Sequence, residues 1–117
     1  MATTSEIAQS LVKMCRAGKF EEPYGALFAQ NARSVEATGE TAAGMDAIHA
    51  KGKMFTEKNN VNGFTVGEPC VGGDLFAVPF TFDITEKATG KHMNLDEIGL
   101  YTVRDGKIVE ERFLYAA

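Results

Sequence analysis

Hydrophobic residues recur every three or four positions in residues 3–18, which is the spacing of one buried face of a helix. The segment opens with Thr3-x-x-Glu6, a pair at capping-box spacing, in which each side chain can bond the other residue's backbone N–H. Gly18 is suited to end this helix, because glycine readily takes the left-handed conformation found at helix C-termini. The predicted buried face consists of Ile7, Leu11, Met14 and Cys15.

The segment that follows predicts two further helices with a short extended piece between them. Residues 21–23, Glu-Glu-Pro, are typical of the first turn of a helix. An extended piece over residues 33–37 precedes a third helix that starts near Gly44. The second helix is expected to present Tyr24, Leu27 and Phe28 on one side, and the third to bury Met45, Ile48 and Phe55.

The second half of the chain alternates between hydrophobic and polar residues, as half-buried strands do. The clearest strand covers residues 74–85, and weaker patterns predict strands over 61–69, 93–103 and 107–115. Asp105-Gly106 predicts a tight hairpin between the last two strands. The two inward faces are predicted to hold Phe76, Val78, Phe80, Phe82 and Ile84, and Met93, Leu95, Glu97, Gly99, Tyr101 and Val103.

Helices followed by a run of antiparallel strands indicate an α+β protein with its helices on one face of a sheet. The 117 residues are enough for a real hydrophobic core, and we expect a single domain over residues 1–117. The net charge of −4 argues against a nucleic-acid or anionic-membrane partner, because either would call for a basic surface. The lysines of the third helix are interpreted as a solvent-facing row: Lys51, Lys53 and Lys58.

The sequence offers little support for a metal or a cofactor, and we expect neither. His92, Asn94 and Asp96 share one strand face, but alternate strand residues lie about 7 Å apart, too far to hold one ion without another strand. Cys15 and Cys70 match no metal-binding or redox spacing. The N-terminal residues lack the features of a signal peptide, and no apolar run is long enough for a membrane span, so we expect a cytoplasmic protein.

Three segments together resemble the NTF2-like superfamily, in particular its SnoaL-like and ketosteroid-isomerase-like branches. They are AGKFEEPYGALFAQNARSVEATGE, AAGMDAIHAKGKMF and DEIGLYTVRDGKIVEERFLY, in this order along nearly the whole chain. The resemblance implies a cone-shaped α+β barrel, with N-terminal helices packed on a strongly curved antiparallel sheet and an apolar cavity at the wide end. It also implies a homodimer formed through the outer face of the sheet.

The resemblance places Glu36 at the position of the general base of the ketosteroid-isomerase branch. An apolar cavity would favour such a base, because poor solvation raises the proton affinity of a carboxylate. The two groups that stabilise the enolate in that branch are missing, since Leu11 and Gly99 stand at their positions. Losing one such donor costs about two to three orders of magnitude in rate, so steroid isomerase activity is not expected. Glu36 facing solvent at a strand edge is the alternative.

Other acidic and aromatic residues are candidates to complete a different site. Glu97 and Tyr101 share the inward strand face and are candidate catalytic groups; a surface salt bridge and a core aromatic are the alternatives. Glu111 is a third inward candidate, whose register depends on the turn at 105–106. The residues predicted to line the pocket are Leu11, Tyr24, Phe55, Phe76, Phe80, Phe82, Gly99, Glu111 and Phe113.

Three functions remain open at this point. The first is acid–base catalysis of the isomerase, cyclase or hydrolase type on a small hydrophobic molecule, with Glu36 as base and Glu97 or Tyr101 as acid or orienting donor. The second is non-catalytic binding of such a molecule in the same cavity. The third is a dimeric interaction module, for which exposed apolar residues opposite Glu97 are the sequence support: Ile98, Leu100 and Val109.

Overall fold

The computed structural model describes residues 1–116 and has three helices and a seven-stranded sheet in this part of the chain. The helices are α1 (Thr4–Arg16), α2 (Glu22–Ala26) and α3 (Met45–Lys58). The strands are β1 (Phe28–Val35), β2 (Thr41–Ala43), β3 (Asn59–Val66), β4 (Cys70–Gly72), β5 (Leu75–Glu86), β6 (His92–Arg104) and β7 (Lys107–Leu114).

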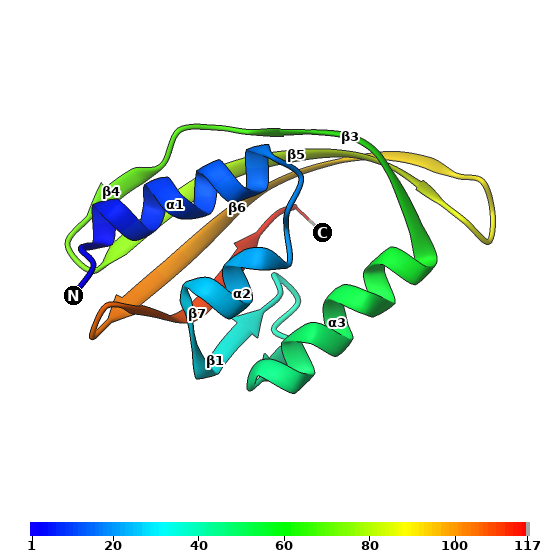
Figure 1. Ribbon diagram of the computed structural model, residues 1–117. Helices are drawn as coiled ribbons and strands as arrows, with labels where there is room; N and C mark the ends of the chain where they lie inside the picture. The colour runs from blue at the N-terminus through cyan, green and yellow to red at the C-terminus, as the bar shows by residue number, and fades with distance from the viewer. Residues whose placement is uncertain (117) are drawn as a thin grey trace.

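The sheet is strongly curved and open, and the helices lie on its concave side. Its strand order is β2-β1-β7-β6-β5-β3, with β4 paired to β5. Figure 1 shows the long strands β5 and β6 arching over the helices. Because β2 leads into α3 and β3 follows it, α3 runs from one edge of the sheet to the other. The predicted α+β class, with helices packed on a curved sheet, is confirmed.

The first helix forms as its sequence predicts. Thr3 and Glu6 make the reciprocal capping box, and the backbone turns at Gly18 with a φ of 79°. The buried face of α1 packs on β3, β4 and β5 and forms much of the core. Its buried residues are Ile7, Ala8, Leu11, Val12 and Cys15.

Two predictions about the middle of the chain are wrong. Phe28 begins β1 instead of ending the second helix, because that helix stops where the Leu27 N–H bonds the Pro23 carbonyl. The first strand therefore runs from 28 to 35 and pairs in parallel with β7, while the other neighbouring strands are antiparallel. Phe55 is 38% exposed and not buried, since only the first part of α3, around Met45 and Ile48, packs into the core.

The hairpin strands place their side chains as the alternation predicts. Asp105 and Gly106 both have positive φ angles, 52° and 75°, as a tight hairpin turn requires. A register shift after this turn sets Glu111 opposite Tyr101, so Glu111 faces inward. None of the helices within residues 1–116 is both long and apolar enough to cross a membrane.

The Tyr101 ring fills the space above Gly99. A Cβ built at position 99 would lie 2.9 Å from the Tyr101 hydroxyl and 3.1 Å from Phe80 Cε2. The missing side chain therefore leaves no void, because the tyrosine ring leans along its own strand and covers the glycine. Gly99 is required by close packing at the floor of the site.

Replacing Gly99 by alanine is expected to lower the free energy of unfolding by about 1–3 kcal/mol, the usual cost of forcing an extra group into a packed core. Urea denaturation measures the difference. Gly63→Ala is the matched control, because Gly63 also lies in a strand and a Cβ there would meet no atom within 4 Å. Equal losses in the two variants would contradict the packing argument.

Candidate functional site

A buried carboxyl, Glu111, lies at the centre of the site. It is 3% exposed and stands directly opposite Ser34 in the parallel pairing of β1 and β7. The Ser34 hydroxyl donates to Glu111 Oε2 at 2.8 Å, and the Tyr24 hydroxyl donates to both carboxyl oxygens at 3.2 and 3.1 Å. Glu111 thus joins β7 to β1 and α2 through hydrogen bonds, which is how a buried carboxyl is normally accommodated.

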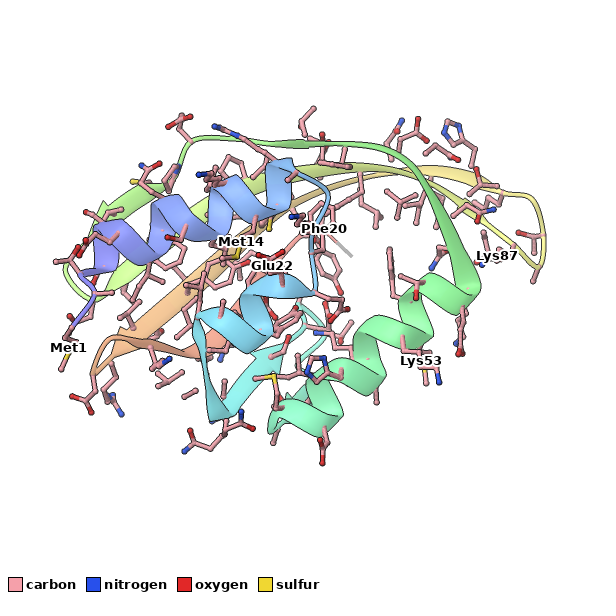
Figure 2. All side chains as sticks on the ribbon, in the orientation of Figure 1. Met1, Met14, Phe20, Glu22, Lys53 and Lys87 are labelled. Carbon is pink, nitrogen blue, oxygen red and sulfur yellow. The ribbon has the colours of Figure 1, made fainter. Side chains whose placement is uncertain are left out.

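Lys51 reaches the same cluster from α3. Its Nζ donates to Ser34 Oγ at 2.7 Å and lies 2.5 Å from Glu36 Oε1. The ammonium also lies 5.1 Å from the centre of the Phe113 ring, within the range of a cation–π contact. The Lys51 side chain is 30% exposed, whereas that of Lys53, which points away from the site in Figure 2, is 78% exposed. The interpretation of these lysines as one solvent-facing row is therefore wrong for Lys51.

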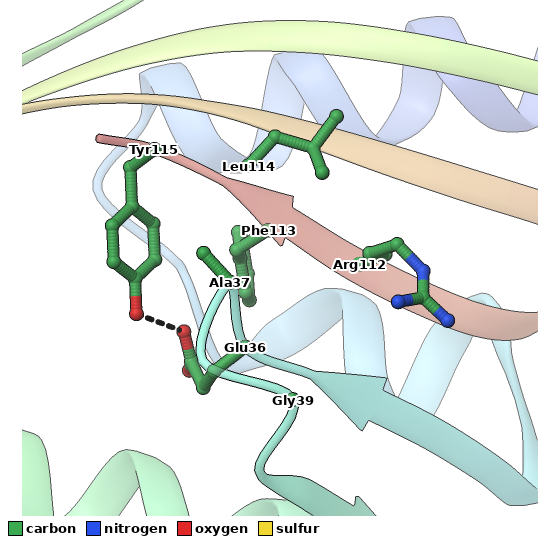
Figure 3. A pocket seen from close by; sticks show the side chains of 7 residues that line it. All are labelled: Glu36, Ala37, Gly39, Arg112, Phe113, Leu114 and Tyr115. Atoms are coloured by element: carbon green, nitrogen blue, oxygen red, sulfur yellow. Dashed lines mark hydrogen bonds between the residues drawn. The ribbon is translucent and has the colours of Figure 1, made fainter. Parts of the chain in front are cut away.

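Glu36 follows β1 directly and lines a pocket. Its carboxyl is partly buried: Lys51 holds one oxygen, and the Tyr115 hydroxyl donates to the other at 3.1 Å. The pocket has a volume of about 290 Å³ and is drawn in Figure 3. The strand-edge alternative, with Glu36 in open solvent, does not describe this geometry. The lining residues are Glu36, Ala37, Gly39, Arg112, Phe113, Leu114 and Tyr115.

Glu97 lies on β6, half-buried and paired across the sheet with Phe80. Its pKa is raised to about 7, mainly by burial and also by the negative charges of Glu36 and Glu111, while the positive charge of Lys51 opposes the shift. No side chain within residues 1–116 donates a hydrogen bond to this carboxyl. Glu97 is therefore a carboxyl that changes charge near neutral pH.

Glu111 also has its pKa raised to about 7, for a different balance of causes. Burial is the largest, and it is opposed by the hydrogen bond from Ser34, by the charge of Lys51 and by the hydrogen bond from Tyr24. The negative charge of Glu111 is also one of the causes of the raised pKa of Glu97. The site holds three carboxyl groups and a single ammonium, so it takes up or releases protons around neutral pH.

Tyr101 forms the floor of the site. It is 2% exposed, and its ring stacks on Phe76 with centroids 4.8 Å apart. Burial raises the pKa of its hydroxyl well above the usual value for tyrosine. This environment is that of a core aromatic, and a proton-transfer role for Tyr101 remains a prediction.

The structure gathers only some of the predicted site residues. Glu36, Glu97, Glu111, Tyr24 and Phe113 meet around Lys51. Leu11 and Phe76 are core residues, and Phe55 lies outside the cluster on the last turns of α3.

A second group of aromatic side chains lies further along the arch. Phe80 and Phe82 stack on each other, and Phe20, under the arch in Figure 2, meets the edge of Phe82. Residues 1–116 contain no cluster of three or more His, Cys, Asp or Glu side chains that could hold a metal ion.

Sequence reasoning missed Lys51, Ser34 and Tyr115. Lys51 follows the buried Ile48 by three positions, so the helical period already places it near the inward face of α3. Ser34 is a small polar residue between Arg33 and Val35 and carries no motif. Its partner Glu111 is 77 positions away, and only the parallel pairing of β1 and β7 brings them together.

The curved sheet, with helices on its concave side and α3 joining its two edges, is the NTF2-like fold. A family model of the SnoaL-like domain matches residues 2–115. The chain therefore belongs to the SnoaL-like family. No curated protein matches it.

Solved structures agree with this assignment. A protein from Mesorhizobium loti, provisionally described as a SnoaL-like polyketide cyclase, is 38% identical, with a TM-score of 0.93 over 97% of this chain and 100% of that one. A ketosteroid-isomerase-like protein from Catenulispora acidiphila, solved with trimethylamine, is 20% identical, with a TM-score of 0.73 over 97% and 88% of the two chains. TerC, co-crystallised with polyporic acid, is 18% identical, with a TM-score of 0.73 over 97% and 92%. The similarity to the last two structures supports the fold alone.

The wild-type protein is expected to lose stability as pH rises, because Glu111 ionises while buried. Glu111→Gln should not show this part of the loss. The unfolded chain releases this proton near pH 4.5 and the folded chain near pH 7. Between these values the folded state binds more protons, so stability falls with rising pH, by roughly 3 kcal/mol for one such carboxyl. The glutamine keeps an acceptor for Ser34 and cannot ionise.

Urea denaturation at about pH 4.5 and about pH 8 measures this difference. Relative to wild type, Glu111→Gln should gain stability on going to the higher pH, while Glu110→Gln, a neighbour beside Arg112, should track the wild type. A variant Glu111→Gln with the same pH dependence as wild type would contradict the assigned titration.

Proposed function

We propose that this SnoaL-like protein catalyses proton transfer on a small hydrophobic molecule that carries a carbonyl group, with Glu97 as the group that moves the proton. The observation that carries the proposal is Glu97 itself: a half-buried carboxyl with a pKa of about 7, beside a lysine and an aromatic wall. A general base works best when its pKa lies near the working pH, and partial burial is the usual way to achieve this for a carboxyl.

Glu97 suits the role of base better than Glu36, which the family resemblance places at that position. Lys51 and Tyr115 already engage both oxygens of Glu36, whereas no side-chain donor within residues 1–116 engages Glu97. In the proposed step, Glu97 takes a proton from the carbon next to the carbonyl and returns it at another position. Glu36 then serves as the partner of Lys51.

The substrate class follows from the walls of the site and from the relatives. Phe113 and Tyr115 line the pocket beside Glu36, and Phe80 pairs with Glu97 across the sheet. These aromatic side chains favour a substrate with an apolar part. Polyketides carry many carbonyl groups with acidic neighbouring C–H bonds, and the Mesorhizobium loti relative is provisionally described as a polyketide cyclase.

Non-catalytic binding is the alternative function, and the pocket volume of about 290 Å³ is the observation in its favour. That volume lies at the lower end of the range for ligand pockets and suits a compact molecule. A protein that only sequesters a ligand would use the same pocket without needing Glu97 to change charge.

The two functions separate in a screen of hydrophobic carbonyl, lactone and epoxide compounds, scored for thermal stabilisation and for turnover, with wild type and Glu97→Gln. The proton-transfer function predicts that Glu97→Gln still binds but loses at least about a hundredfold in kcat, the usual contribution of a general base. In the wild type, kcat/KM should rise as pH increases through about 7, because the base acts in its ionised form.

Asp96→Asn is the matched control, since Asp96 is the exposed neighbour of Glu97 on the same strand. Binding without turnover in both wild type and variants would support the sequestering function. Turnover that survives in Glu97→Gln and disappears in Glu36→Gln would return the role of base to Glu36.

We also propose that the protein forms a homodimer through the outer face of β6 and β7. Ile98 and Leu114 are directly paired there, each is 44% exposed, and Leu100 lies beside them. Sedimentation at micromolar concentration should show a dimer, and Ile98→Lys should shift it toward monomer, because a charge would be buried unpaired in the interface. A wild-type monomer under these conditions would refute the dimer.

A further inference from the structure

Proton removal next to a carbonyl leaves negative charge on the carbonyl oxygen, and catalysis requires a group that stabilises this charge. An ionised carboxylate cannot do so, and the Glu111 carboxyl already receives hydrogen bonds from Ser34 and Tyr24. The Tyr101 ring stacks on Phe76 at the floor of the site, with its hydroxyl against Gly99. Lys51 bonds directly to Glu36 and Ser34, and its positive charge opposes the raised pKa of both Glu97 and Glu111.

The donor and acceptor of each hydrogen bond that links Lys51, Ser34 and Glu111 can be assigned. An ammonium has only donors, so Ser34 Oγ must accept from Lys51 Nζ. Ser34 then has its own proton free, and this proton points to Glu111 Oε2. Tyr24 donates to the same carboxyl. The chain therefore runs from Lys51 through Ser34 to Glu111, and it fixes where the ammonium lies.

The chain uses only part of the ammonium's capacity. Of the three N–H bonds, one goes to Ser34 and one to Glu36. The Phe113 ring, whose centre lies 5.1 Å from Nζ, also lines the pocket that Glu36 borders. Within residues 1–116, no third side chain accepts a hydrogen bond from Lys51. One N–H is thus left for a ligand oxygen.

We propose that Lys51 is the catalytic residue that binds and stabilises the negatively charged oxygen of the substrate, with Ser34 and Glu111 as the residues that position it. The role of Lys51 in turnover rests on the proposed proton-transfer function. The assignment narrows the substrate to a compact enolisable ketone or a phenol, whose oxygen meets Lys51 while its ring or chain lies against Phe113.

A bound phenol tests this assignment without any turnover. 4-Nitrophenol is the probe, because its phenolate absorbs in the visible and the pKa of the bound molecule can be titrated directly. In the wild type this pKa should lie below that of the free phenol. An opposite charge within about 4–6 Å shifts a pKa by roughly one unit or more, so Lys51→Met should raise the bound pKa by about one unit.

Glu36→Gln should change the same pKa in the opposite direction. Removing the counter-ion leaves the Lys51 charge free to act on the phenol, so the pKa of the bound phenol should fall below the wild-type value. Ser34→Ala should raise the pKa of the bound phenol part of the way to its value in Lys51→Met, because the ammonium loses the hydrogen bond that positions it. Lys53→Met is the matched control, since Lys53 lies two positions away on the exposed side of α3 and should change nothing.

The outcomes separate this inference from the proposed function. Equal phenol pKa values in wild type and Lys51→Met, or no binding of the phenol by wild type, would overturn the role of Lys51. If Lys51→Met does not fold, Lys51→Gln, which removes the charge but keeps a hydrogen-bond donor, replaces it in the comparison with the same expected rise of the phenol pKa. A lowered phenol pKa in a protein that turns over no carbonyl compound would support Lys51 and overturn the proton-transfer function.

Discussion

The hydrogen bond from Ser34 to the buried Glu111 is the interaction on which the rest of the site depends. The two residues are register partners in the parallel pair of β1 and β7, which connects the short first strands to the long hairpin strands. Tyr24 brings α2 to the same carboxyl, and Lys51 brings α3 to the serine. A buried carboxyl that loses such partners costs several kcal/mol, so these four elements are held together by one small polar network.

The apolar surroundings explain why the pKa values of two carboxyl groups at this site, Glu97 and Glu111, lie near neutral pH. Burial is the largest cause of the raised pKa in both Glu97 and Glu111, and one ammonium is too little positive charge to cancel it. The packing of Tyr101 on Phe76 and over Gly99 closes the floor beneath these groups. A ligand that adds or removes charge at Lys51 will therefore also change the number of protons on the two carboxyls.

The sequence predicted best the features that depend on neighbouring residues. The capping box of α1, the alternation in β5 and the turn at 105–106 are local patterns, and the inward face of β6, with Glu97 and Tyr101, followed from them. Ser34 and Lys51 could not be recognised in the same way. Their roles depend on a parallel strand pair between distant segments and on how far one lysine side chain reaches under the sheet. The periodicity of a helix or strand predicts which side chains share a face. It does not predict which distant residues those side chains will contact.

The surroundings of Glu36 are set largely by one neighbour, Lys51. Glu36 follows β1 at the edge of the pocket, where the resemblance to ketosteroid isomerases places a base. In this chain Lys51 lies at hydrogen-bonding distance from it, and Ser34 and Glu111 fix that lysine from the other side. A carboxylate held in this way orients and partly neutralises a cation. In the proposed mechanism, the ammonium of Lys51 takes the place of the two donors whose positions Leu11 and Gly99 occupy in the family resemblance. In this proposed mechanism, Glu97 transfers the proton and Lys51 stabilises the charge that develops on the substrate oxygen.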